Sequence, residues 1–258
     1  MITDDFDYLA PGGRSYTITA GLIAKINKRS KALEIASGRG EAACTLAREF
    51  KCRVEAFDID PVMIEYSRKK AEKLVLDDLV SFDVKDGRDM DFGEGKYDFI
   101  LAEGGALTYI GRDEGIERCA SLLKEGRCLA FTDLIYTRND VSEPVREAYE
   151  EGVFKYITEI EYRKLLERNG FEILFLAMLP QSAWDRYYMQ MRRKVINAKD
   201  KYTQKFKDSM MREIDVYYNF GGMYSVGYLY VVARLAKKKQ VGPAPKDLRI
   251  PLMFNLNL

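Results

Sequence analysis

The sequence predicts an α/β protein with a Rossmann-like, doubly wound sheet of seven strands, mostly parallel with an antiparallel final strand. Three observations support this fold. Short apolar runs alternate with amphipathic segments between residues 14 and 134, which is the pattern of parallel strands joined by crossover helices. A Gly-rich loop follows the first apolar run. Residues 182–220 have helical periodicity and precede a long last apolar run, which predicts a helical lid insertion beside an antiparallel edge.

The individual elements follow from local patterns. Apolar residues at helical spacing after the loop Pro11-Gly12-Gly13 predict a first helix from about Ser15. Pro61 suits the first position of a helix, and Thr158 and Gly170 suit the start and the end of another. The expected strands are 32–36, 53–57, 80–84, 97–102, 128–134, 171–176 and 224–235. The other expected helices are 41–50, 61–76, 158–169 and 113–123, the last of which Gly126 should end.

The whole of residues 1–236 is expected to form one domain, whose lid consists of residues 137–157 and 182–220. We expect residues 237–258 to be a tail that packs on the domain or on a partner subunit, which leaves a homodimer open. Residues 1–7 lack the apolar segment of a signal peptide. No run reaches the roughly 18 apolar residues that a membrane helix needs. The sequence therefore predicts a cytoplasmic protein.

The composition excludes several kinds of catalytic site. The chain has no His, so Ser-His-Asp and Cys-His mechanisms are excluded. Its four cysteines, at positions 44, 52, 119 and 128, form no C-x-x-C pair, and we expect no metal site. The net charge of +1, from 41 basic and 40 acidic residues, argues against nucleic acid and membrane surfaces as partners.

The Gly-rich loop at residues 36–40 lies between an expected strand and an expected helix, where a nucleotide-like ligand meets a helix N-terminus. The dinucleotide fingerprint G-x-G-x-x-G does not fit, because Ala36 and Glu41 stand at its first and third glycines. The carboxylate of Glu41 would also repel a pyrophosphate. NAD is therefore disfavoured as the ligand, and an NAD-dependent oxidoreductase is kept as an alternative.

Four segments resemble, in order, the motifs of class I S-adenosylmethionine-dependent methyltransferases. Residues 34–40 (E-x-A-x-G-x-G) are similar to the family's acidic residue followed by G-x-G-x-G, with Glu for the commoner Asp and Ala for the first Gly. Residues 58–63 (DIDPVM) resemble its D-x-S-P-x-M run, with Asp60 in place of Ser. Residues 86–88 (DGR) resemble its G-D-A motif, and residues 97–104 resemble its F-D-x-V-x strand and the loop after it. The P-G-G sequence before the first helix resembles the UbiE-like, small-molecule branch.

This resemblance implies S-adenosylmethionine as the cofactor, with S-adenosylhomocysteine as the product and no metal. It implies that Asp58 binds the ribose hydroxyls, that Ile59 and Met63 flank the adenine, and that Asp86 accepts from the adenine amino group. A β-turn role for Asp86 and a solvated loop position for Glu103 are the alternatives. The expected cofactor-binding residues are Gly13, Glu34, Ala36, Gly38, Gly40, Asp58, Ile59, Met63, Asp86, Gly87, Arg88 and Glu103.

The methyl acceptor is expected at the carboxyl ends of the strands, where their loops meet the N-terminal segment and the lid. The candidates for positioning it or accepting its proton are Glu103, Asp133 and Tyr136. Trp184, Tyr187, Tyr188 and Met191 share a helix face, so a core role is the alternative for this stripe. The basic residues of the same segment suggest a solvated face, or else an anionic acceptor or RNA. The expected substrate contacts are Tyr8, Tyr16, Tyr109, Tyr136, Trp184 and Tyr188.

The sequence thus predicts a methyltransferase that transfers a methyl group from S-adenosylmethionine to a small-molecule acceptor by in-line displacement. The Asn-Pro-Pro-Tyr or Asp-Pro-Pro-Tyr tetrapeptide of amine-methylating members is absent, because residues 103–106 are Glu-Gly-Gly-Ala, and this disfavours base N-methylation. An RNA or protein methyltransferase is the first alternative. A non-catalytic protein that binds S-adenosylmethionine or NAD is the second.

Overall fold

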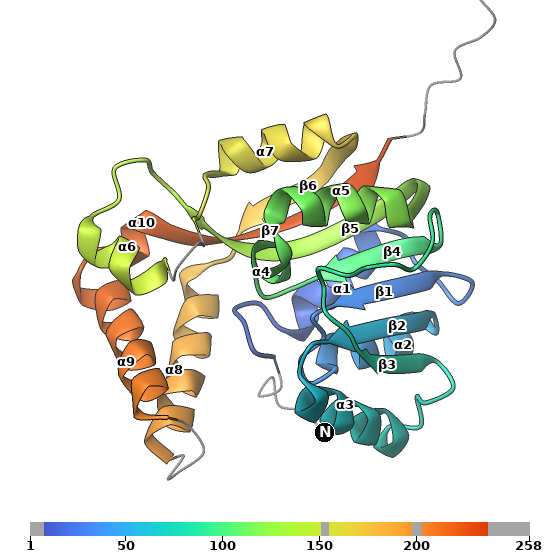
Figure 1. Ribbon diagram of the computed structural model, residues 1–258, viewed down its shortest axis with the longest axis horizontal. Coiled ribbons are helices and arrows are strands. Elements are labelled where there is room, and N and C mark those ends of the chain that lie inside the picture. The colour runs from blue at the N-terminus through green and yellow to red at the C-terminus, as the bar shows by residue number, and fades with distance from the viewer. Residues whose placement is uncertain (1–7, 151–154, 198–202, 237–258) are drawn as a thin grey trace, which may run out of the picture.

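The computed structural model describes residues 8–150, 155–197 and 203–236. Over these residues seven strands form a single sheet with helices on both of its faces (Figure 1). None of the helices described is long and apolar enough to cross a membrane. The strands are β1 Lys31–Ile35, β2 Arg53–Asp58, β3 Val80–Val84, β4 Tyr97–Ala102, β5 Leu123–Tyr136, β6 Phe171–Met178 and β7 Val226–Leu235. The helices are α1 Arg14–Ile23, α2 Glu41–Phe50, α3 Pro61–Lys73, α4 Ala106–Ile110, α5 Arg112–Leu122, α6 Glu143–Tyr149, α7 Glu159–Arg168, α8 Gln181–Asn197, α9 Gln204–Asn219 and α10 Gly222–Ser225.

The strand order is β3-β2-β1-β4-β5-β7-β6. Strands β1 to β5 pair in parallel, whereas β7 is antiparallel to both β5 and β6. This topology confirms the predicted fold class, including the antiparallel final strand. The order reverses at β1, because β2 and β3 lie on one side of it and β4 lies on the other. A ligand crevice is expected at such a point, at the carboxyl ends of the strands.

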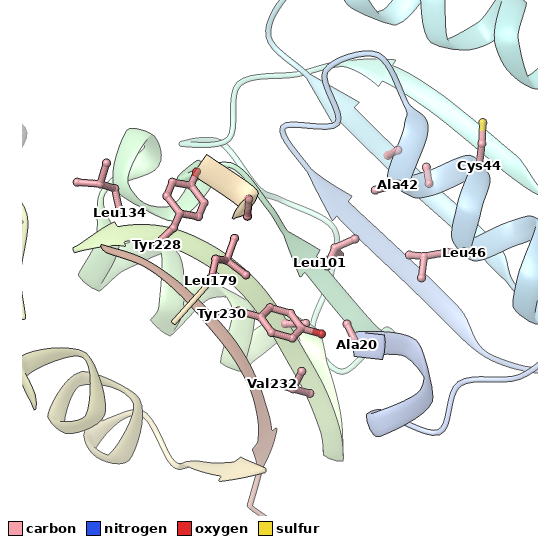
Figure 2. Packing of buried hydrophobic residues seen from close by; sticks show 14 of the residues in the cluster. Ala20, Ala42, Cys44, Leu46, Leu101, Leu134, Leu179, Tyr228, Tyr230 and Val232 are labelled. Carbon is pink, nitrogen blue, oxygen red and sulfur yellow. The ribbon is translucent and has the colours of Figure 1, made fainter. Parts of the chain in front are cut away.

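Two apolar layers cover the two faces of the sheet. Helices α1, α2 and α3 pack on one face, where Ala20 and Leu46 are buried together with Leu101 and Val232 of the strands. Figure 2 shows this layer, with side chains from α1, α2, β4 and β7 gathered in one cluster. Helices α5 and α7 cover the opposite face, where Tyr162 is fully buried. The central strands are therefore buried on both faces, as their continuous apolar runs predict.

Local capping signals fix the start of two helices where the sequence predicts them. Helix α3 begins at Pro61, and the Asp60 carboxylate accepts a hydrogen bond from the Val62 amide at 2.8 Å. Helix α7 begins with a capping box, in which the side chains of Thr158 and Glu161 each accept a bond from the other residue's backbone N–H. Both helix starts are thereby confirmed.

Strand β5 differs from its prediction. It begins at Leu123, directly after α5, whereas the sequence predicts a strand from Cys128 and a helix that Gly126 ends. Gly126 instead has a φ angle of +76° inside the strand. The pairing with β4 also shifts register between Tyr97–Leu123 and Phe99–Cys128. This irregularity in the pairing accommodates three extra residues of β5, which periodicity alone reads as a loop. The short helices α4 and α10 are not predicted by the sequence patterns either.

The lid comprises α6, α8 and α9, which gather beyond the ends of the parallel strands (Figure 1). Trp184 of α8 stacks on Tyr217 of α9, with ring centroids 4.8 Å apart. Tyr149 of α6 and Tyr188 of α8 share a hydrogen bond of 2.7 Å between their hydroxyls. The predicted helical insertion is therefore confirmed. Residues 151–154 and 198–202 of the predicted lid lie outside the described residues, as does the predicted tail at 237–258.

Candidate functional site

The loop between β1 and α2 has a tightly constrained backbone. Ala36, Gly38 and Gly40 have φ angles of +54°, +50° and +68°, in the left-handed region that favours glycine. A Cβ atom at Gly40 would lie 2.7 Å from Phe82 Cζ and 2.8 Å from Ser67 Cβ, so no other residue fits there. Ala36 adopts the same region at a cost of roughly 1 kcal/mol. The loop therefore turns closely into the N-terminus of α2, the helix end that favours anionic and polar ligand groups.

Asp58 at the end of β2 ties this loop to the neighbouring strand. One of its carboxylate oxygens accepts a hydrogen bond from the Gly38 amide at 2.8 Å, and the other accepts one from the Asp60 amide at 3.0 Å. From α3, the Ser67 hydroxyl donates to the Gly38 carbonyl oxygen at 3.0 Å. Each carboxylate oxygen can accept a further bond. Asp58 can therefore hold the loop and bind ligand hydroxyls at the same time.

Two carboxylates lie on neighbouring strands. Glu34 is within β1, and Glu103 comes directly after β4. Glu34 is 4% exposed, and among the described residues its Oε2 atom has no hydrogen-bond partner. Burial, and then the charge of Glu103, raise the pKa of Glu34 well above its usual range. Burial also raises the pKa of Glu103 to about 7, although the Thr17 hydroxyl, 3.1 Å from both of its oxygens, opposes the shift. A positively charged ligand group placed here would stabilise both ionised carboxylates.

Glu34, Asp58 and Glu103 line a cavity of about 200 Å³, which we term the loop cavity. Two of its charged side chains already have partners. Glu41 pairs with Lys70 at 2.8 Å, and Arg39 lies 5.2 Å from the centre of the Tyr66 ring. The charged residues in the described part of its wall are Glu34, Glu41, Asp58, Glu103 and Arg39. The excess of carboxylates favours a ligand that carries positive charge.

A second cavity of about 350 Å³ adjoins the loop cavity, and we term it the aromatic chamber. It extends from the loop after β4 to the lid helices α8 and α9. The aromatic residues of its wall are Tyr109, Tyr149, Tyr156, Trp184, Tyr187, Phe206 and Tyr228. The two cavities share Leu9, Ala10, Pro11, Gly104 and Tyr109. A polar, acidic cavity thus opens beside a largely aromatic one, an arrangement that suits two ligands bound side by side.

Asp133 of β5 lines the aromatic chamber but is already hydrogen-bonded on several sides. It accepts from Thr108 Oγ1 at 2.6 Å, from Arg112 Nε at 3.3 Å and from the Tyr162 hydroxyl. Burial raises the pKa of Asp133, and the guanidinium of Arg112 opposes that shift. These bonds tie β5 to α4, α5 and α7. The geometry therefore gives Asp133 a structural role and little freedom to act as a base.

The structure brings many of the predicted site residues together. Tyr8 and Tyr109 of the predicted substrate set line the loop cavity. Tyr109 also lines the aromatic chamber, together with Trp184 and Asp133. The predicted cofactor residues in the wall of the loop cavity are Gly13, Glu34, Ala36, Gly38, Asp58 and Glu103.

Other predicted residues lie outside the walls of both cavities. Asp86 is hydrogen-bonded to Arg88 at the surface, and this lowers the pKa of its carboxyl to about 2. Tyr16 packs edge-on against the Tyr230 ring, and Tyr136 is buried in the core near Tyr156. The remaining predicted residues outside the walls are Gly40, Ile59, Met63, Gly87 and Tyr188.

The aromatic stripe of α8 serves both of the roles that the sequence left open. Trp184, Tyr187 and Met191 line the aromatic chamber. Tyr188 is 1% exposed, and its hydroxyl donates to Glu213 Oε1 of α9 at 2.9 Å. A core role is therefore confirmed for Tyr188, while its neighbours on the same stripe face the cavity.

Sequence reasoning missed Glu213, which also lines the aromatic chamber. Phe206, Met210 and Glu213 occupy positions i, i+4 and i+7 of α9, and all three lie in the chamber wall. A carboxylate that continues an apolar helix face is a sequence signal that could have identified it.

Comparisons with known proteins point to the same family as the sequence motifs. A family model described as a methyltransferase domain matches residues 32–126. The chain is similar to the methyltransferase GfsG of Streptomyces halstedii, with 26% identity over 66% of this chain and 63% of that protein. It is also similar to the 27-O-demethylrifamycin SV methyltransferase of Amycolatopsis mediterranei, with 27% identity over 59% of this chain and 55% of that protein. The chain thus spans less than two thirds of the length of both relatives.

Among solved structures, the chain resembles an S-adenosylmethionine-dependent methyltransferase from Thiobacillus denitrificans in complex with S-adenosyl-L-homocysteine. The TM-score is 0.73 at 20% identity, over 90% of this chain and 94% of that one. This likeness concerns the fold, because function is carried by the site and not by the fold. Residues 32–126 therefore match a methyltransferase-domain model, and the sheet topology and the solved structure show that the chain has a Rossmann-like fold.

Proposed function

We propose that this protein is an S-adenosylmethionine-dependent methyltransferase that methylates a small-molecule acceptor and belongs to the UbiE-like branch. The observation that carries the proposal is the junction of the two cavities, where the acidic loop cavity meets the aromatic chamber at Leu9, Gly104 and Tyr109. One relative is named for its action on 27-O-demethylrifamycin SV, a small molecule. Pro11 and Gly13 of the P-G-G segment lie in the wall of the loop cavity, which supports the branch.

The loop cavity fits S-adenosylmethionine on two grounds. Glu34 Oε2 is buried without a partner among the described residues, and the ligand's ammonium or sulfonium would supply the missing positive charge. Asp58 keeps acceptor capacity for the ribose hydroxyls beside its bond to Gly38. When bound, the cofactor supplies an electrophilic methyl group on a sulfonium. The roles of Ile59 and Met63 beside the adenine stay predictions.

The residues of the chain would act by positioning the acceptor and excluding water. The segment Leu9–Pro11 and the side chain of Tyr109 lie in the walls of both cavities, so they border the point at which the two ligands would meet. Glu103, whose pKa burial raises to about 7, is the carboxylate best suited to accept a proton near neutral pH.

Three further expectations stay predictions: a cytoplasmic location, a homodimer and chemistry without a metal. In the part of the chain that the structure describes, no three His, Cys, Asp or Glu side chains are arranged to hold a metal ion.

Two measurements test the proposed function. Calorimetric titration with S-adenosylhomocysteine and, separately, with NAD should give binding with the former alone. Incubation with methyl-labelled S-adenosylmethionine and fractions of a cell extract should then place the label in the small-molecule fraction. Binding of NAD in place of S-adenosylhomocysteine, or label found in RNA or protein, contradicts the proposal. Binding without transfer to any fraction would favour the non-catalytic alternative.

Binding of S-adenosylmethionine should tighten as the pH rises from about 6 to about 8. The positive charge of the ligand favours the ionised form of Glu103, whose pKa of about 7 in the free protein is raised by burial. The free protein therefore binds this proton more tightly than the complex does, and ligand binding releases it. Affinity should increase up to about ten-fold across this range.

Calorimetry at pH 7 in two buffers with different ionisation enthalpies measures the proton release directly. The affinity of the Glu103→Gln variant should change less over the same pH range than that of the unmodified protein. Equal affinities of the unmodified protein at pH 6 and pH 8 would show that Glu103 does not face the ligand's charge.

A further inference from the structure

The aromatic chamber carries a distribution of charge that methyl transfer by itself does not require. The charged side chains in the described part of its wall are the carboxylates of Asp133 and Glu213, and neither Lys nor Arg occurs there. Asp133 pairs with Arg112 at 3.3 Å, and Arg112 is not part of the wall. Such a wall disfavours anionic ligands, because a carboxylate or phosphate would lie beside two carboxylates.

Glu213 accepts a hydrogen bond from one tyrosine, whose hydroxyl also contacts that of a second tyrosine. The Tyr188 hydroxyl donates to Glu213 Oε1 at 2.9 Å, and it lies 2.7 Å from the Tyr149 hydroxyl. Tyr188 itself is fully buried. A carboxylate whose orientation is fixed in advance binds a partner group with less loss of side-chain entropy.

The aromatic rings around Glu213 are neutral and firmly packed. Burial, followed by the charge of Glu213, raises the pKa of Tyr187 above its usual range. Trp184 stacks on Tyr217 at 4.8 Å and meets Tyr228 edge-on at 5.6 Å. Faces of aromatic rings attract cations, most strongly where water is excluded. A carboxylate among several such rings is the combination that recognises an ammonium group.

We propose that the methyl acceptor is an aliphatic amine, which enters the aromatic chamber as its ammonium form and is held there by Glu213 and the surrounding rings. This inference rests on the proposed function and deepens it, because it names the acceptor's chemical class. An aliphatic amine has a localised nitrogen lone pair, unlike the conjugated amine of a nucleobase.

The transfer step balances without a further reactant. The ammonium first loses one proton to solvent, which frees the nitrogen lone pair. That pair then forms the new bond between nitrogen and the methyl carbon, while the carbon–sulfur bond breaks and its electrons stay on sulfur. The products are the N-methylated ammonium and the neutral thioether.

The test uses three matched series of probes, each with an amine, an alcohol and a carboxylate on the same skeleton. These are phenethylamine, 2-phenylethanol and phenylacetate; tyramine, tyrosol and 4-hydroxyphenylacetate; and octylamine, octanol and octanoate. Each is titrated into the full chain saturated with S-adenosylhomocysteine. In at least one series the amine should bind about ten-fold tighter than the alcohol, and the carboxylate should bind weakest.

Two variants separate the charge of Glu213 from its shape. Glu213→Gln can still accept from Tyr188, so it should keep the alcohol affinity within about two-fold while the amine affinity falls about ten-fold. Asp215→Asn removes one charge from an exposed position of the same helix and should change neither affinity. Thermal unfolding of each variant checks that it is folded.

The inference is overturned if no amine binds, if alcohols or carboxylates bind as tightly as amines in every series, or if Glu213→Gln leaves the preference intact. The binding of S-adenosylhomocysteine is measured in the same experiments. If it is normal while the amines fail, the acceptor class is wrong and the proposed function stands. If it is absent, the proposed function itself fails.

Discussion

Replacement of Arg112 by Met should destabilise the fold by about 3–5 kcal/mol, the cost of leaving a buried charge without its partner. The Arg112 side chain is 10% exposed and Asp133 beside it is 1% exposed. The guanidinium also donates to the Tyr162 hydroxyl at 2.9 Å and to Thr108 Oγ1 at 2.6 Å. Methionine keeps the apolar stem but none of these bonds. Urea unfolding followed by circular dichroism measures the loss in the free energy of unfolding.

Arg138→Met is the matched control, because Arg138 pairs with Asp140 at the exposed surface. Its unfolding midpoint should stay close to that of the unmodified protein, since exposed ion pairs contribute little. Combining Arg112→Met with Asp133→Asn should recover part of the lost stability, because the second change removes the unpaired charge. If Arg112→Met behaves like the control, the buried network does not hold β5 in place.

Replacement of Asp58 by Ala should weaken the binding of S-adenosylhomocysteine at least about ten-fold, or roughly 1.5 kcal/mol. Asp58 holds the loop through the Gly38 amide at 2.8 Å and, in our proposal, also accepts from the ribose. Alanine removes both bonds. Titration calorimetry measures the change, and unfolding experiments confirm that the variant is folded.

Asp83→Ala provides the control for Asp58. Asp83 lies on the neighbouring strand β3, in backbone register with Phe57, and its side chain is exposed. Its affinity should match that of the unmodified protein. The variant Asp58→Asn keeps an acceptor for the Gly38 amide while losing the charge, so its affinity should lie between the two. Unchanged binding by Asp58→Ala would remove the ribose assignment.

The parts of the fold that depend on nearby residues were predictable from the sequence. Helix α3 starts at Pro61 and α7 starts after Thr158 because both caps are formed by residues within a few positions. The loop at Gly38 and Gly40 was recognisable for the same reason. The register shift in β5 was not predictable, because it depends on how that strand pairs with β4.

The positions of the predicted site residues divide in the same way. Glu34, Asp58 and Glu103 follow directly after or within parallel strands, so the topology brings them to one cavity. Asp86 also follows a strand, yet its carboxylate forms an ion pair with the nearby Arg88 at the surface. Glu213 reaches the aromatic chamber only through the way α9 packs on α8. Such packing between distant segments is not visible in a local sequence pattern.

The position of β7 has a consequence for how the chain is made. This strand lies between β5 and β6. Its residue Arg234 pairs with Cys128 of β5 on one side and with Glu172 of β6 on the other. A ribosome builds β5 and β6 well before β7 emerges, and until then each has an unpaired edge toward the gap. Open edges of this kind invite pairing with other chains. The nascent protein is therefore most exposed to aggregation late in its synthesis, when almost all of the sheet is present except the strand that joins its two parts.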